Sequence, residues 1–296
     1  HLDMLNRYFM LLDGEQELIQ ALPEAIDAHF HLDRLGYREG VTFNDIFEIP
    51  TPDNIPEEFR VNLVGAVANF ADPKSWPTGE QVRKWQGIKP TIGIHPKRLR
   101  DAKGEKFQQL AELVESEHIS GLGEIGLDVQ NPTDWESQRD QMELLAKILP
   151  LAYSKPDKVL VLHCRGDHQQ PGHQDYVILQ LLTCLQAAHV PREQLIHFHC
   201  YDGSPRAAQN WIKQYPNTYF GFTRLITSKP TTFKVMDLGR ILLETDAPYF
   251  STNEPKPSTR HHIGMVASVL APIRNMDWEA LLERANENAR DLYIFH

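Results

Sequence analysis

The sequence predicts an α/β protein with a TIM-type (β/α)8 barrel and a metal site at the C-terminal face of the strands. Eight short runs of β-branched and apolar residues recur along the chain, and most are separated by stretches with the apolar spacing of an amphipathic helix. Alternating strands and helices form parallel sheets, and eight such units suggest a closed barrel. Histidine and acidic residues stand at the ends of six runs, the first and five others, which is where barrel enzymes place their active sites.

Length and composition fit one such domain. The chain has 296 residues, of which 41% are hydrophobic and 24% charged, and barrels of this length fold as a single domain. We expect the domain to span residues 1–296, with the barrel core at about 24–296 and an N-terminal extension at 1–23. No segment is apolar over the ~20 residues that a membrane span needs, and no signal peptide is evident.

Charge and cysteine content narrow the class of partner. The three cysteines form no CxxC pair, which fits a reducing compartment and argues against a thiolate zinc site. The formal net charge is −10, whereas proteins that hold long duplex DNA by its backbone usually present a basic surface. A nucleic-acid substrate would therefore be met locally, by a few Arg and Lys side chains and by metal ions. We expect a monomeric protein of the cytoplasm or nucleus.

The elements follow in chain order. We expect strands at residues 24–29, 62–69, 90–95, 119–125, 158–163, 194–199, 218–222 and 241–245. The clearest helical spacings lie at 106–117, 133–153, 174–188 and 205–215, with a last helix at 278–288. Residues 36–60 and 247–262 are rich in proline and polar residues, and we expect them to be loops, either solvated insertions or substrate lids.

The candidate site begins with His29 and His31. They stand two residues apart at the end of the first strand, so both side chains point to one face. Two inward imidazoles make a poor core and a good half-site for a metal ion. The other strand ends supply the rest of the predicted ligand set, which is His29, His31, Glu124, His163, His199 and Asp246.

These residue types indicate hydrolysis assisted by metal ions. Four imidazoles and two carboxylates suit two divalent ions such as Mg²⁺, Mn²⁺ or Zn²⁺, and Glu124 could bridge them through its two oxygens. A bound metal can lower the pKa of water from ~15.7 to ~7, and Asp246 would take the proton of the attacking water.

Several assignments leave alternatives open. His95, before Pro96 at a strand end, could contact phosphate, bind a metal ion or be a loop histidine. Arg165 could form an ion pair or a fork for phosphate. His199 is preferred to His197 as a ligand because it lies at the strand end, and a structural role is expected for His197.

The motifs DAHFHLD, GIHP, GEIGLD, LHCR, HCYDG and ETDAPYF, in this order, resemble the TatD-type deoxyribonucleases of the amidohydrolase superfamily. The resemblance covers about residue 25 to the end, and residues 197–223 look closest to a eukaryotic branch. It implies metal-dependent, mainly 3′→5′ exonuclease activity on DNA, especially on single strands, with RNA as a substrate of some relatives. The loop after Asp246 departs from the family, because its basic residues follow Asn253 to Pro255 where they usually precede them.

The resemblance also implies roles for single residues. His29, His31 and Asp246 would hold one metal ion, His163 and His199 the second, and Glu124 would bridge the two. His95 and Arg165 would lie close to the scissile phosphate.

We weigh three functions. The leading hypothesis is phosphodiester hydrolysis at the ends of single-stranded or frayed DNA, supported by basic residues expected on the catalytic face: Arg34, Arg38, Lys97, Arg98, Arg100 and Arg224. Tyr37, Tyr201 and Phe222 could stack a terminal base or pack the loops. The alternatives are a small-molecule amidohydrolase or phosphotriesterase on the same scaffold, and a catalytically silent binding protein.

Overall fold

The computed structural model describes residues 8–12, 15–19, 21–39, 51–101, 104–130, 135–153, 155, 157–250 and 258–295. Its centre is an eight-stranded sheet in which every neighbouring pair is parallel, in the order β10-β9-β8-β7-β6-β5-β4-β3. The strands are β3 (Glu24–Phe30), β4 (Asn62–Phe70), β5 (Ile88–Ile92), β6 (Gly121–Asp128), β7 (Val159–Arg165), β8 (Ile196–Phe198), β9 (Thr218–Phe222) and β10 (Ile241–Leu243). All eight predicted strands are therefore present.

Backbone hydrogen bonds close this sheet into a barrel. The Asp246 N–H donates to the His29 carbonyl at 3.0 Å, and the His31 N–H donates to the Ala247 carbonyl at 2.8 Å. The buried Asp27 carboxylate accepts a further bond from the Thr245 N–H at 3.0 Å. These contacts join the first strand of the barrel to the segment after the last, which confirms the predicted (β/α)8 barrel.

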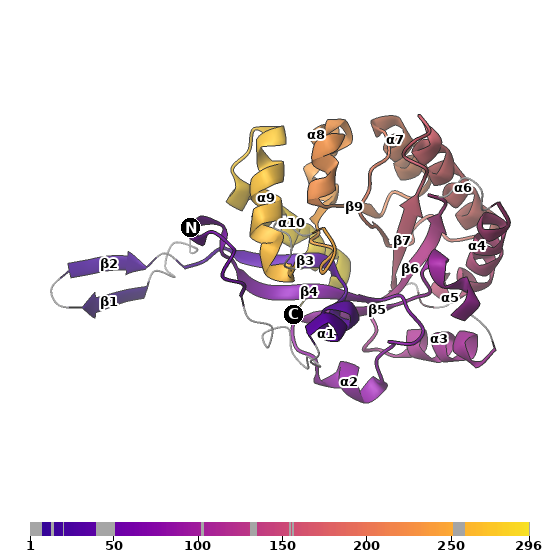
Figure 1. Cartoon of the computed structure of the whole chain (residues 1–296), viewed down its shortest axis with the longest axis horizontal. Helices are drawn as coiled ribbons and strands as arrows, with labels where there is room; N and C mark the ends of the chain where they lie inside the picture. Colours follow the sequence, from indigo (N-terminus) through magenta and orange to yellow (C-terminus); the bar gives the residue numbers. More distant parts are fainter. Residues whose placement is uncertain are drawn as a thin grey trace.

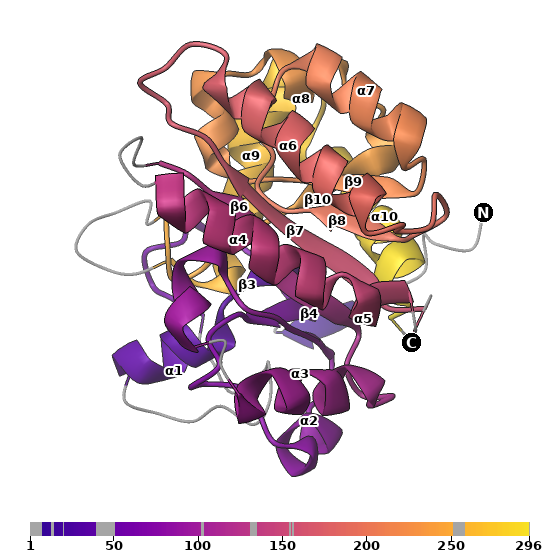
Figure 2. The same ribbon diagram turned by 90° about the vertical axis from the view of Figure 1, so that its right-hand side faces the viewer.

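The helices lie outside the strands (Figure 1, Figure 2). They are α1 (Leu32–Glu39), α2 (Gly79–Lys84), α3 (Glu105–Glu115), α4 (Trp135–Ile148), α5 (Pro150–Tyr153), α6 (His173–Ala187), α7 (Pro205–Gln214), α8 (Thr231–Val235), α9 (Ile263–Leu270) and α10 (Trp278–Tyr293). Within the described residues, none of them is long and apolar enough to cross a bilayer.

Local chemistry sets the helix ends. The Ser204 hydroxyl accepts from the Ala207 N–H at the start of α7, and the Asp277 carboxylate accepts from two N–H groups at the start of α10. The helix predicted over 133–153 is instead two helices, since Pro150 has no N–H to continue α4. The first two residues of that prediction, 133 and 134, lie outside the described residues.

The strands have a hydrophobic cluster on each face. Strand residues that face the helices belong to the larger cluster. Those that face the barrel interior belong to a second cluster, which includes Ile26, Ala28, Val67, Val161 and Leu242. Leu292 and Tyr293, at the end of α10, complete the second cluster. The last helix thus reaches the residues that fill the barrel, and it contacts the underside of the site described below.

The segments predicted as loops and extension hold more structure than expected. The stretch 36–60 begins inside α1 and contains a 3-10 helix at Glu57–Phe59, while residues 40–50 lie outside the described part. The N-terminal extension contains an antiparallel hairpin of β1 (Tyr8–Leu12) and β2 (Glu15–Ile19), which Figure 1 draws beside the barrel. In the stretch 247–262, residues 258–262 are described and include a short 3-10 helix, Arg260–His262.

Candidate metal centre and active site

The eight residues predicted for the site meet at the carboxyl ends of the strands. Seven of them line one cavity of about 440 Å³: His31, His95, Glu124, His163, Arg165, His199 and Asp246. The eighth, His29, is fully buried beside it, with its Nε2 2.8 Å from Glu124 Oε1. The fold thereby gathers side chains from six strands, or from the residues that directly follow them, around one cavity.

Glu124 lies at the centre of the group, and its two oxygens face different histidines. Oε1 lies 2.8 Å from His29 Nε2 and 3.2 Å from His31 Nε2. Oε2 lies 3.3 Å from His163 Nδ1 and 3.8 Å from His95 Nε2. Since Glu124 is only 2% exposed, its carboxylate needs positive charge on both sides.

Hydrogen bonds on the far side of two rings fix which nitrogen faces Glu124. His31 Nδ1 lies 3.2 Å from the Asn69 carbonyl, which can only accept, so this nitrogen donates and, in the neutral ring that binds a metal ion, Nε2 carries the lone pair. His163 Nε2 lies 3.1 Å from Asp128 Oδ2, so Nδ1 carries its lone pair. An imidazole held in this way by a carbonyl or carboxylate is the usual arrangement of a metal-binding histidine.

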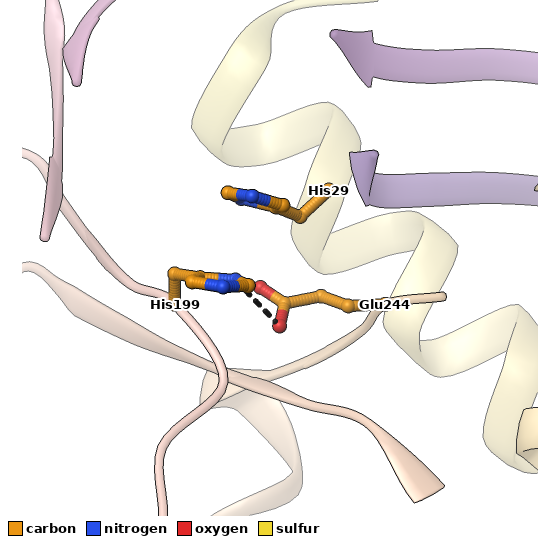
Figure 3. A group of neighbouring side chains, drawn as sticks. All are labelled: His29, His199 and Glu244. Atoms are coloured by element: carbon orange, nitrogen blue, oxygen red, sulfur yellow. Dashed lines mark hydrogen bonds and ion pairs between the residues drawn. The ribbon is translucent and has the colours of Figure 1, made fainter. Parts of the chain in front are cut away.

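His199 is held by a buried carboxylate that the sequence analysis did not assign. Its Nδ1 donates to Glu244 Oε2 at 3.1 Å, and the Cys200 N–H donates to the same oxygen at 2.9 Å. Figure 3 shows the His199 ring beside the Glu244 carboxylate and parallel to the His29 ring, with ring centroids 3.6 Å apart. His199 Nε2 is therefore directed toward the site, 3.8 Å from Asp246 Oδ1.

The group His29, His199 and Glu244 has the spacing of a metal site, but its carboxylate is already engaged. His197 Nε2 donates to Glu244 Oε1, and the Tyr293 hydroxyl donates to His197 Nδ1 at 2.7 Å. Because both Glu244 oxygens accept hydrogen bonds, this group orients His199. The expected structural role of His197 is consistent with its place in this chain of bonds.

In His95 the ring nitrogen that faces the cavity carries the proton, in contrast to His31 and His163. The Lys97 N–H donates to His95 Nδ1 at 3.1 Å, so in the neutral ring the proton resides on Nε2, which faces the cavity. Burial, with a smaller contribution from the neighbouring His163, lowers the pKa of His95 to about 3. A neutral ring with an Nε2–H can donate to a phosphate oxygen but has no lone pair there for a metal ion.

Charge in the site is balanced by protons. Burial alone would lower the pKa of His31, but Glu124 and Asp246 outweigh it and raise that pKa to about 9. Burial raises the pKa of Asp246, but His199 and His31 outweigh it and hold the carboxyl below its usual range. A proton on His31 thus occupies the place between the two carboxylates that a cation could take.

Two predicted ligands that line the cavity have a buried atom with no hydrogen bond within the described residues: His163 Nδ1 and Asp246 Oδ1. Buried polar atoms are normally paired, so unpaired nitrogen and oxygen atoms around one cavity fit a divalent ion. Two groups with the spacing of metal sites lie here, His29, His31 and Asp246 in one and His95, Glu124 and His163 in the other.

Basic side chains stand at the rim of the cavity. Asp72 Oδ2 fixes two of them, Arg34 Nη2 at 2.7 Å and Arg98 Nη2 at 3.2 Å, and Lys97 Nζ lies 2.9 Å from Asp128. Arg165, 9% exposed, donates to the Cys200 carbonyl at 2.9 Å. Basic side chains therefore reach this cavity on a chain whose net charge is −10, with Asp72 and Asp128 fixing their positions.

Several basic and aromatic residues that were predicted to bind the substrate do not line this cavity or lie outside the described part. The Arg224 Nε donates to the Phe250 carbonyl, Arg100 does not line the cavity, and the side chains of Tyr37 and Arg38 lie outside the described part. Phe222 is fully buried in the core, so its faces cannot stack a base.

The sequence analysis missed two aromatic residues at this site. Tyr249 and Phe250 line the cavity, and Tyr249 is 41% exposed with its ring edge-on to His31 at 5.4 Å. Their position directly after Asp246 was the available signal.

Known proteins resemble the chain over nearly its whole length. The sequence profile of the family described as "TatD related DNase" matches residues 26–294. The human "3′-5′ RNA nuclease TATDN2" is 27% identical over 285 residues, which cover 90% of this chain and 35% of the human protein, so the chain spans about a third of that relative. The "3′-5′ ssDNA/RNA exonuclease TatD" of Erwinia billingiae is 27% identical over 220 residues, covering 69% of this chain and 76% of that protein.

Solved structures share the fold. A TatD homologue from Escherichia coli K12, YJJV, superposes with a TM-score of 0.69 at 20% identity, covering 91% of this chain and 98% of that chain. An amidohydrolase from Saccharomyces cerevisiae superposes with a TM-score of 0.67 at 14% identity, covering 92% of this chain and 100% of that chain.

Proposed function

This chain belongs to the TatD-related DNase family and is a metal-dependent hydrolase of phosphodiester bonds, and from that premise we propose that it is a 3′→5′ exonuclease. Its substrates are single-stranded or frayed DNA ends, with RNA as a second class. The relatives described as a 3′-5′ RNA nuclease and as a 3′-5′ exonuclease of single-stranded DNA and RNA support this choice.

One observation carries the proposal: the two oxygens of Glu124 face two separate sets of ligand atoms. We assign one divalent ion to His29, His31, Asp246 and Glu124. The second belongs to Glu124, His163 and His199, since the rings of His163 and His199 lie 6.2 Å apart and His199 Nε2 is directed into the site, 3.8 Å from Asp246 Oδ1. Mg²⁺, Mn²⁺ and Zn²⁺ all accept such nitrogen and oxygen ligands.

Ions bound there would neutralise phosphate charge and make a water molecule more acidic. The chain supplies the other parts of the reaction. Asp246, ionised at neutral pH, accepts the proton of the attacking water. Arg165 and the Nε2–H of His95 donate to phosphate oxygens and hold the scissile group in place. Arg34 and Arg98 attract the phosphates of the strand.

The direct test is hydrolysis of 5′-labelled single-stranded DNA in Mg²⁺ or Mn²⁺, with a chelator control and an RNA strand of the same sequence. We expect a ladder that shortens from the 3′ end and is abolished by the chelator. No cleavage by protein that carries two ions per chain would contradict the proposal and favour a small-molecule hydrolase.

Metal binding is tested separately from activity. A ligand present at 100 times its Kd stabilises the native state by about 2.7 kcal/mol per site. We therefore expect the thermal midpoint of the metal-free chain to rise on addition of Mn²⁺. No rise, together with no bound metal by elemental analysis, would exclude the assigned ligand set.

A further inference from the structure

A second cavity of about 430 Å³ opens beside the metal site. Gln130, Arg165 and Phe250 line both cavities, so a bound molecule can extend from one into the other. The first cavity is lined mainly by charged side chains. The second has a different character, and nothing in the proposed reaction has so far used it.

Apolar side chains form much of the second cavity. Leu225, Ile226, Tyr201 and Phe250 line it, and Leu225 is 45% exposed. Arg224 Nε donates to the Phe250 carbonyl at 3.0 Å and so helps to hold that wall in place. A small pocket with apolar walls and a few polar groups is typical of a site for an uncharged ring system, such as a nucleobase.

One carboxylate oxygen in this cavity has no hydrogen bond within the described residues, although it lies near a cation. Asp202 Oδ1 is buried and accepts no hydrogen bond within the described residues. Arg165 Nη1 lies 3.6 Å from it, and His168 Nδ1 lies 3.8 Å from Asp202 Oδ2, which are both longer than a hydrogen bond. A carboxylate oxygen in this state is an acceptor for a donor on a ligand.

The charge of Asp202 restricts that ligand. A carboxylate repels a phosphate group but accepts a hydrogen bond from a sugar hydroxyl. A strand that continued past this point would bring its next phosphate near Asp202, whereas a strand that ends there presents a hydroxyl. The volume is near the lower end of the range for small-ligand pockets, which suits one nucleoside.

We propose that the second cavity binds the terminal nucleoside of the substrate strand, with Asp202 accepting a hydrogen bond from its free 3′-hydroxyl. This inference rests on the proposed exonuclease function. The base packs against Leu225 and Phe250, and Arg165, between the two cavities, faces the scissile phosphate. Asp202 is then a specificity residue that recognises a strand end.

The test compares single-stranded oligonucleotides of one sequence that end in a 3′-hydroxyl or a 3′-phosphate. We expect the wild type to prefer the hydroxyl by at least ~10-fold in kcat/KM, the ratio that 1.4 kcal/mol of charge repulsion produces. Asp202→Asn keeps the shape and removes the charge, so the preference should fall below ~3-fold, mainly because the phosphate-ended strand is cleaved faster. An unchanged preference in Asp202→Asn would overturn the assignment.

Asp140→Asn is the control, since Asp140 is exposed and lines neither cavity. If Asp202→Asn fails to fold, Leu225→Ser replaces it, with the exposed Val235→Ser as its control. We expect Leu225→Ser to weaken competitive inhibition by deoxythymidine 5′-monophosphate at least ~5-fold, because apolar burial contributes ~0.8 kcal/mol per methylene group and serine lacks most of the leucine side chain. Equal inhibition of both variants would contradict the base pocket.

Failure of the two proposals can be distinguished. If the wild type cleaves no oligonucleotide, the exonuclease function is wrong, and calorimetry with the metal-loaded protein still decides whether the cavity binds deoxythymidine 5′-monophosphate. Tighter binding than its 3′-deoxy analogue, lost in Asp202→Ala, which removes the acceptor oxygens, would support the nucleoside site. Equal binding of both nucleotides would refute it.

Discussion

Replacing Glu244 by glutamine is expected to weaken binding of the second metal ion about 10-fold, the lower end of the range for residues that support a metal ligand. The carboxylate accepts from His197, His199 and the Cys200 N–H. Glutamine retains one of its two acceptor oxygens. His199 and Cys200 share Oε2, so the amide oxygen can stay there while the amide nitrogen takes the place of Oε1.

The amide nitrogen then donates to His197 Nε2, and His197 must move its proton to Nδ1. Tyr293 allows this change, because its hydroxyl, 2.7 Å from Nδ1, can accept as well as donate. His199 keeps its proton on Nδ1 and its lone pair on Nε2. Glu244→Gln therefore removes only the negative charge of the carboxylate, which makes His199 Nε2 a stronger metal ligand.

Tyr293→Phe removes the accommodating hydroxyl. Alone it should change metal affinity little, but combined with Glu244→Gln it should bring the total loss toward ~100-fold, since the two sites are coupled. Metal titration against a competing chelator dye measures each Kd, with the exposed Glu112→Gln as control. An unchanged Kd in Glu244→Gln, or strictly additive losses in the double variant, would refute this reasoning.

Three further predictions concern charge. Burial raises the pKa of Asp27 to about 7 from 3.8, so its contribution to the stability of the metal-free chain is present below pH ~4 and lost as pH rises through ~7. Asp27→Asn should therefore have a higher thermal midpoint than the wild type at pH 8 but not at pH 4. The same difference in thermal midpoint at both pH values would contradict the raised pKa of Asp27. Because the pKa of His31 is raised to about 9, metal binding at pH 7 displaces a proton, so affinity should rise ~10-fold per pH unit up to that value. Calorimetry in two buffers of different ionisation enthalpy detects the released proton. A metal Kd that does not change with pH would contradict the assignment of His31 as a metal ligand. Arg165→Lys should lower kcat/KM ~10²-fold with metal Kd unchanged, as for loss of a donor to developing charge; wild-type kcat/KM would rule out the phosphate contact.

The barrel could be predicted because its determinants are local. Each strand is a short apolar run, and the residues after it are the ones that the fold gathers at one face. His31, Glu124 and His163 meet in the structure although they are far apart in the sequence. Their prediction required only the strand ends and the rule that parallel strands point the same way.

What could not be predicted depends on contacts between distant residues. Glu244 and Asp246 are two residues apart, yet one holds His199 from beneath while the other faces the cavity, and Asp246 has a positive φ of 54° that local patterns do not reveal. The hydrogen bond that sets which nitrogen of His199 carries the proton comes from Glu244, which follows β10 and is 45 residues away in the sequence. The second cavity has no sequence signature, because separate loops line it.

The central claim is that Glu124 joins two metal ions that together hydrolyse the phosphodiester. Its most direct test is to measure bound metal per chain and kcat/KM on single-stranded DNA for the wild type, Glu124→Ala and Asp246→Asn. We predict two ions and activity for the wild type. Glu124→Ala should bind fewer than two ions, both variants should lose at least ~10² in kcat/KM, and both should keep the wild-type fold by circular dichroism. Two ions and wild-type kcat/KM in Glu124→Ala would contradict the account.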